Sequence, residues 1–279
     1  MKTLSLGYSP CPNDTFIFYA LVHGRIDTGG VGFREVLEDV ETLNQMAREA
    51  RLDITKASFH AFGHLRDDYC LLRAGGALGK GCGPLVVVRE ESDMPALRNK
   101  TIAIPGRLTT AFLLLQAFDP SLKDNVVVMP FDRIIDAVKG GAADAGLIIH
   151  ESRFTYQRAG LRKVIDLGDW WERETGRPIP LGGILAKRSL GPDLIGKIDV
   201  LLRKSVEYAF GHRAEPVAYI RRHAQEMEDE VINQHIDLYV NNYSLDIGED
   251  GLLAVDELFR RAEKSGAIPP SDKPLLVAA

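Results

Sequence analysis

The sequence contains little cysteine and no long apolar segment. Its 279 residues include three cysteines, Cys11, Cys70 and Cys82, an odd number at irregular spacing. Such spacing indicates neither a disulfide framework nor a CxxC metal site, and it is typical of the reducing cytoplasm. Since no run reaches ~18 apolar residues, we expect no membrane-spanning helix. The N-terminal MKTLSLGYSPCPND lacks the apolar segment of a secretion signal, so we expect a cytoplasmic location.

Basic charge is also scarce. The formal net charge is −5, and no basic tract is longer than a few residues. We therefore expect no nucleic-acid partner. An anionic ligand would have to be held by local groups rather than by the field of the whole protein. The polar turns described below, and not the net charge, predict a small-molecule carboxylate as the partner, and the sequence fits either a monomer or a homodimer.

The rest of the composition, 45% hydrophobic and 26% charged, is ordinary for a globular protein. Apolar runs alternate with helical patterns, and this alternation restarts near residue 99 after a charged turn. From residue 192 onward the pattern is helical. We predict an α/β protein of two lobes with a central cleft. Residues 1–95 and 186–279 would form a discontinuous first lobe that carries the C-terminal helices, and residues 96–185 the second lobe.

Residues 146–156, GLIIHESRFTY, place a histidine at the end of a predicted strand. In α/β proteins, ligands bind beyond the carboxyl ends of the strands. His150 is therefore a candidate proton acceptor, because the ordinary pKa of histidine is about 6.5. A histidine that only hydrogen-bonds its neighbours is the alternative, and the position alone favours it. Glu151 either orients the imidazole or caps the following helix.

Another polar turn, in the predicted second lobe, follows the strand at residues 101–104. Gly106 allows close approach of the backbone, and a helix is predicted to begin near Thr109. The free amides of that helix, with the hydroxyls of Thr109 and Thr110, would form a seat for a carboxylate or phosphate. An ordinary helix cap explains the pattern equally well.

The predicted first lobe has two similar turns. Lys56, Ala57 and Ser58 end one predicted strand, and Ser58 could cap the helix that follows. Asn13 and Asp14 follow the first strand, and either could cap the next helix. Several polar turns that face one cleft indicate a small, polar and acidic ligand.

Other motifs carry less weight. His60 and His64 have a spacing that could chelate a metal, but no HExxH motif or third ligand accompanies them, so we interpret them as residues of a helix face. The glycine-rich residues 75–83 lack the GxxxxGK[ST] order of a phosphate loop and indicate close backbone approach or a hinge. Cys11 lies at a helix start, but no feature pairs it with a base, so we do not expect a nucleophile.

Four stretches in combination resemble one enzyme family. They are residues 9–16 (SPCPNDTF), 37–44 (LEDVETLN), 106–111 (GRLTTA) and 146–156. They are similar to the 1,4-dihydroxy-6-naphthoate synthases of the futalosine pathway of menaquinone biosynthesis, and the similarity covers essentially the whole chain. The resemblance implies a type II periplasmic-binding-protein fold. It also implies a cofactor-independent lyase, without a metal, that converts cyclic dehypoxanthine futalosine to 1,4-dihydroxy-6-naphthoate and dihydroxyacetone.

The resemblance further implies roles for individual residues. The family's proton acceptor corresponds to His150. Residues that contact the substrate correspond to Lys56, Ala57, Ser58, Thr109 and Thr110, and the same cleft is expected to include Asn13, Asp14 and Asn44.

Two other functions fit the same fold. A solute-binding protein for a small carboxylate needs no catalysis, although the lack of a secretion signal and the histidine at the cleft argue against it. Chorismate dehydratase, which acts in the same pathway, is the other alternative, and the SPCPNDTF and IIHESRFTY stretches favour the naphthoate synthase over it.

Overall fold

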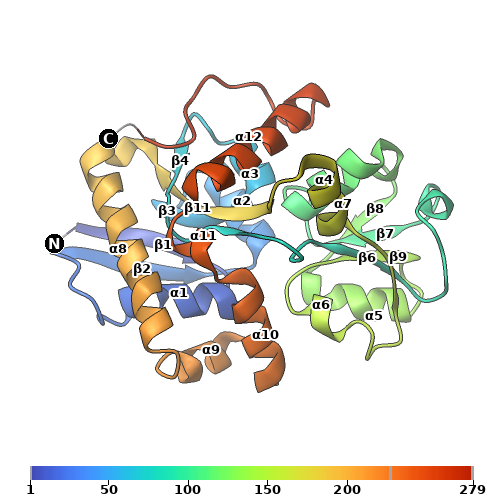
Figure 1. Ribbon diagram of the computed structural model, residues 1–279, viewed down its shortest axis with the longest axis horizontal. Coiled ribbons are helices and arrows are strands. Elements are labelled where there is room, and N and C mark those ends of the chain that lie inside the picture. Colours follow the sequence, from blue (N-terminus) through green and yellow to red (C-terminus); the bar gives the residue numbers. More distant parts are fainter. Residues whose placement is uncertain (1, 226–227, 278–279) are drawn as a thin grey trace.

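The computed structural model describes residues 2–225 and 228–277. In this part of the chain the strands form two sheets, which lie side by side in Figure 1. The first sheet has the order β2-β1-β3-β11-β4, with β5 paired to β11, and comprises β1 (Lys2–Tyr8), β2 (Val31–Leu37), β3 (Ile54–Ser58), β4 (Tyr69–Leu71), β5 (Ala77–Gly79) and β11 (Ile179–Lys187). The second has the order β10-β6-β9-β7-β8 and comprises β6 (Leu85–Val88), β7 (Ile102–Ile104), β8 (Val126–Val128), β9 (Ala145–Ile148) and β10 (Arg162–Asp166).

Helices cover both sheets. Those that accompany the first sheet are α1 (Pro12–Val22), α2 (Val40–Arg48), α3 (Phe59–Gly63), α8 (Pro192–Gly211), α9 (Val217–His223), α10 (Asp229–Tyr239), α11 (Asn242–Leu245) and α12 (Gly248–Lys264). Those near the second sheet are α4 (Thr110–Phe118), α5 (Ile134–Lys139), α6 (Ser152–Thr155) and α7 (Leu167–Thr175). Short 3-10 turns are η1 (Pro95–Leu97), η2 (Pro120–Leu122), η3 (Phe131–Arg133) and η4 (Arg188–Leu190).

The innermost strands are fully buried. Every residue of β3, β6 and β9 is buried, as expected for strands covered on both faces. Helix α2 instead buries one face, with Leu43 and Ala47 turned inward and charged residues outward. Asp39 begins this helix by accepting hydrogen bonds from the backbone amides of Glu41 and Thr42.

The α/β class and the C-terminal run of helices were predicted correctly, but two strands belong to the other sheet. The sequence division placed β6 in the first lobe, within residues 1–95, and most of β11 in the second, within residues 96–185. Strand pairing joins β6 to β9 and β10, and joins β11 to β3, β4 and β5. The sequence of an apolar strand does not show which strand it pairs with, so composition could not assign β6 and β11 to a sheet. We therefore propose that the crossovers lie between β5 and β6 and between β10 and β11.

The arrangement brings the ends of several strands together between the two sheets. Strands β1 and β3 run parallel in the first sheet, and β7 and β9 run parallel in the second. Their carboxyl ends lead into α1, α3, α4 and α6, whose first residues lie near one another. In the described part of the chain, no helix is both long and apolar enough to cross a lipid bilayer.

Candidate active site

A pocket lies between the two sheets, at the ends of these strands. Its walls are Ser9, Asn13, Asp14, Val40, Lys56, Ala57, Ser58, Ala77, Cys82, Pro84, Thr109, Thr110, Ala111, Ile149, His150, Leu181, Gly182 and Tyr239. Every site residue predicted from the sequence lines this pocket except Asn44. The three turns that the sequence placed at one cleft therefore do meet.

His150 lies two residues after the end of β9, and its backbone conformation is unusual. Its φ is 54°, in the left-handed region that few residues other than glycine adopt. The imidazole packs against Phe131, with ring centroids 4.9 Å apart, and lies parallel to the ring of His235 at 6.0 Å. Burial lowers the pKa of His150 to about 4, and the nearby carboxylate of Asp14 offsets part of this effect. The imidazole is therefore neutral near pH 7 and can accept a proton.

A buried ion pair lies beside His150. The Lys56 ammonium, at the end of β3, is 3.0 Å from Oδ1 of Asp14, in the first turn of α1. The same carboxylate accepts hydrogen bonds from the Ser9 backbone amide, the Ser9 hydroxyl and the Asn13 side-chain amide. These donors hold Asp14 in place and satisfy a charge that would otherwise be costly to bury.

The helix cap expected from Asn13 or Asp14 was wrong. Helix α1 begins earlier, with Cys11 at the N-cap and Pro12 at its first position. Proline suits that position because its ring fixes a helical φ and its missing N–H would lack a helical partner anyway. Asn13 and Asp14 therefore lie inside the first turn, and their side chains are free to reach Lys56 and the pocket.

Asn44 acts behind the pocket rather than in its wall. Its Oδ1 accepts a hydrogen bond from the Ser58 backbone amide at 3.0 Å, and its Nδ2 donates to the Ser58 hydroxyl at 3.1 Å. Ser58 occupies the N-cap of α3 as predicted, but its hydroxyl is engaged by Asn44. Next to it, a Cβ on Gly182 would lie 2.7 Å from the carbonyl oxygen of Ala57, so glycine is needed for this close strand contact.

The helix cap expected in the turn at Thr109 and Thr110 is present, and the seat for an anion stays a prediction. The Thr109 hydroxyl caps α4 by accepting from the Phe112 amide at 3.3 Å, and it donates to the Gly106 carbonyl at 2.8 Å. The Thr110 hydroxyl donates to the Leu181 carbonyl at 2.6 Å. Both residues also line the pocket, and the first-turn amides of α4 lack helical acceptors, so this end of the helix suits an anion.

The two lobes also touch outside the pocket. The Glu41 carboxylate in α2 accepts a hydrogen bond from the Leu108 amide at 3.2 Å. Burial between the lobes raises the pKa of Glu41. A Cβ on Gly106 would come within 2.3 Å of this carboxylate, so the turn before α4 fits closely against α2.

Sequence reasoning missed the contribution of α10. His235 and Tyr239 lie four residues apart on one helix face, with their rings 4.7 Å apart, and Tyr239 reaches the pocket wall. Both are buried in a helix that begins about 80 residues after His150. The only signal was the i,i+4 spacing of two polar aromatic residues on an otherwise apolar face. Ser9 was missed as well, although it belongs to a stretch that carries the family resemblance.

One cluster of the described residues could hold a metal. A ligand atom from each of Cys11, His150 and Glu151 lies within 4.8 Å of the others. A thiol, an imidazole and a carboxylate are a ligand set that zinc accepts. Burial and the Glu151 charge raise the pKa of the Cys11 thiol well above its ordinary value, which opposes thiolate formation. That same shift argues against Cys11 as a nucleophile.

Comparison with known proteins gives the relationship. A model of the protein family described as Menaquinone biosynthesis matches residues 4–264. The chain belongs to this family. It is 54% identical over 277 residues to the 1,4-dihydroxy-6-naphthoate synthase of Thermus thermophilus, covering 99% of this chain and 100% of that protein. It is 47% identical over 272 residues to the enzyme of the same name from Streptomyces coelicolor, covering 96% and 95%.

These relatives confirm the resemblance inferred from the four sequence stretches. The chain is thus a lyase of the 1,4-dihydroxy-6-naphthoate synthase group. A crystal structure of an Archaeoglobus fulgidus protein, 37% identical, matches with a TM-score of 0.89 over 95% of this chain and 98% of that one.

The predicted fold is confirmed by more distant structures. A Candida albicans protein described as having the generic periplasmic binding protein fold matches at a TM-score of 0.70 and 14% identity, covering 98% of this chain and 92% of that one. The alkanesulfonate-binding protein of Xanthomonas axonopodis matches at 0.71 and 13% identity, covering 97% and 95%. At identities this low, the similarity shows a shared fold and nothing more.

Proposed function

We propose that this menaquinone-biosynthesis lyase converts cyclic dehypoxanthine futalosine to 1,4-dihydroxy-6-naphthoate and dihydroxyacetone, with His150 as the general base. The observation that carries the proposal is the place of the His150 imidazole in the wall of a pocket that also holds a buried ammonium group. The proposal includes a cytoplasmic location, with which three cysteines in the free form agree.

The chemistry assigned to His150 follows from its charge state. A neutral imidazole removes a proton beside a carbonyl group and starts the elimination that releases the three-carbon fragment. The imidazolium that forms lies near Asp14, whose negative charge favours the protonated ring. Formation of an aromatic product then supplies much of the driving force.

The remaining pocket residues would bind and orient the substrate. Lys56 presents a positive charge, and the first turn of α4 presents amides beside Thr109 and Thr110, so a carboxylate or sugar hydroxyls can be held from two sides. Ala57 and Ser58 supply the end of β3 between them. Asn44 contributes by bracing Ser58.

The deciding experiment is incubation of the purified chain with cyclic dehypoxanthine futalosine while the naphthoate absorbance is followed. We expect turnover by the wild type, and a loss of roughly 10²–10⁴-fold in His150→Ala with the fold and substrate binding retained. Near-wild-type turnover in that variant would remove His150 from its role. Stoichiometric binding without conversion would instead indicate a solute-binding protein. Loss of water from chorismate in a parallel assay would indicate a chorismate dehydratase.

A further inference from the structure

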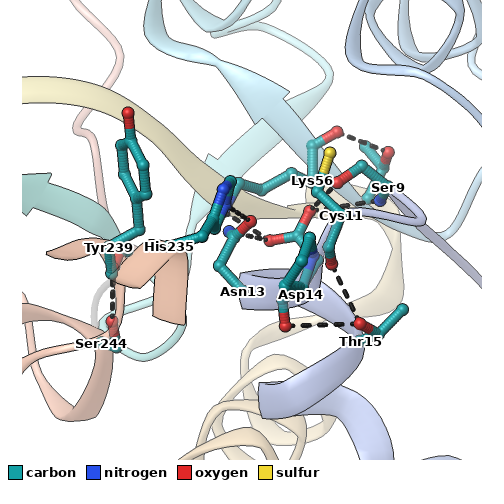
Figure 2. A network of polar contacts seen from close by, with 12 residues as sticks. Ser9, Cys11, Asn13, Asp14, Thr15, Lys56, His235, Tyr239 and Ser244 are labelled. Carbon is teal, nitrogen blue, oxygen red and sulfur yellow. Dashed lines mark hydrogen bonds and ion pairs between the residues drawn. The ribbon is translucent and has the colours of Figure 1, made fainter. Parts of the chain in front are cut away.

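His235 is the most deeply buried polar side chain beside the pocket that the proposed reaction leaves without a role. It lies on α10 with 0% of its surface exposed. Its Nε2 is 2.8 Å from Oδ1 of Asn13, on α1. Figure 2 shows His235 facing Asn13 and Asp14, with the Lys56 side chain beside them.

The hydrogen bonds of Asn13 determine which nitrogen of His235 carries a proton. The Asn13 Nδ2 donates to Oδ1 of Asp14 at 2.8 Å. If the amide were reversed, its oxygen would face the Asp14 carboxylate, and two acceptors cannot form a hydrogen bond. The amide therefore has only one favourable orientation. The Asn13 oxygen then accepts from His235, and the hydrogen must be on Nε2.

Ionisable and aromatic side chains surround this ring. It lies against His150 and Tyr239, with centroid distances of 6.0 and 4.7 Å, and its Nδ1 is 3.8 Å from a carboxylate oxygen of Glu151. Burial lowers the pKa of His235 well below its ordinary value, and His150 and Lys56 lower it further. Two carboxylates lie near this ring, that of Glu151 beside Nδ1 and that of Asp14 beyond Asn13.

We propose that His235 is a positioning residue for the pocket. With a proton on Nε2, its imidazole fixes the amide of Asn13, and Asn13 in turn orients the Asp14–Lys56 pair. The chain of contacts therefore connects α10, through α1, to the end of β3. His235 does not itself line the pocket wall, so it acts through Asn13 and Lys56, which do.

The first test reads the tautomer directly and is independent of the assigned reaction. The ¹⁵N shift of the His235 Nε2 in the labelled full-length protein at pH 7 should be that of a protonated nitrogen. An unprotonated Nε2, with the proton on Nδ1 instead, would overturn the proposal, because the ring could then no longer donate to Asn13.

The second test measures the effect of His235 on kcat/KM, and it rests on the proposed function. We expect His235→Leu to lower kcat/KM by roughly 10–100-fold, the range typical of residues that orient a ligand through a neighbour. His235→Gln places an amide N–H near the position of Nε2 and should recover most of this loss. Ile236→Val, the matched control on α10, removes a buried methyl group outside the relay and should leave kcat/KM unchanged.

A double variant separates positioning from general packing. Because His235 acts through Asn13, the loss in His235→Leu combined with Asn13→Leu should be clearly smaller than the product of the two single losses. Fully multiplicative losses, or no rescue by His235→Gln, would contradict the relay. If the wild type shows no turnover of the expected substrate, the proposed function fails, and the tautomer measurement still decides the placement of the proton.

Discussion

His150 illustrates at the scale of one residue what the sequence could and could not tell. Its place after an apolar run predicted a histidine at the end of a strand, and in the structure His150 lies just beyond the end of β9. The left-handed backbone at this residue was not predictable, because only tertiary contacts hold an L-residue in a conformation that costs roughly 1–2 kcal/mol. Such conformations persist where the surroundings determine them, and they cluster at functional sites.

The pKa of His150 predicts how activity depends on pH. Protonation blocks a general base, and burial lowers the pKa of this group to about 4. The acid limb of kcat/KM that belongs to His150 should therefore lie near pH 4, with little change between pH 5.5 and 7.5. A profile of kcat/KM from pH 4 to 9 checks this, with the residual rate of His150→Ala as the control. A limb near pH 6.5 would mean that the imidazole is solvated in the free enzyme.

Thr109 should affect both stability and substrate binding. Its hydroxyl caps α4 and lines the pocket, so Thr109→Val should lower the free energy of unfolding by about 1 kcal/mol and raise KM. Thr109→Ser keeps the hydroxyl and should preserve both quantities. Urea unfolding and steady-state kinetics on the two variants check this. An unchanged KM in Thr109→Val, with the loss of stability, would show that the turn serves only as a cap.

At the scale of elements, the glycine-rich residues 75–83 have the structural role predicted for them, and they also contain β5, which the sequence did not reveal. Gly83 packs against the backbone of Gly168 at the start of α7: a Cβ on Gly83 would lie 2.3 Å from both the Cα and the amide nitrogen of Gly168. This close approach fastens the crossover before β6 to a helix of the second lobe. A glycine-rich stretch indicates that another part of the chain packs closely against it, but it does not identify which element this is.

Substitution of Gly83 should therefore be more harmful than substitution of an ordinary turn glycine. Backbone atoms cannot move aside as a side chain can, so Gly83→Ala should cost about 3 kcal/mol of unfolding free energy, the upper end of the usual range for overpacking. Gly160, with a φ of 80° and open space around its Cα, is the control, and Gly160→Ala should cost only about 1 kcal/mol. Equal losses in the two variants, measured by urea unfolding, would contradict the close packing.

At the scale of the whole molecule, local patterns predicted the elements better than their partners. The alternation of strands and helices indicated two lobes, and most predicted elements are present. Long-range pairing decides that β6 and β11 belong to opposite sheets, and it also brings α10 to the pocket. These contacts join residues far apart in the chain, and single-sequence periodicity carries no information about them.

Buried histidines should make the folded protein sensitive to acid. Burial lowers the pKa of His60 and of His150 to about 4 each, and it lowers that of His235 well below its ordinary value. In the unfolded chain a histidine has a pKa of about 6.5. Between about pH 6.5 and 4 the unfolded state therefore binds protons that the native state does not, so the free energy of unfolding falls as the pH falls.

His60 allows this acid sensitivity to be tested away from the pocket wall. Its ring Nδ1 is 3.3 Å from the Thr109 carbonyl oxygen, at the contact between α3 and α4. His60→Gln keeps a donor but cannot titrate, so between pH 6 and 4.5 its stability should fall less steeply than that of the wild type, by up to about 1.4 kcal/mol per pH unit. Ile268→Val, which loses packing against Gly63, should give a curve parallel to that of the wild type. Urea unfolding at several pH values measures these slopes, and equal slopes in His60→Gln and the wild type would show that His60 is protonated in the folded protein.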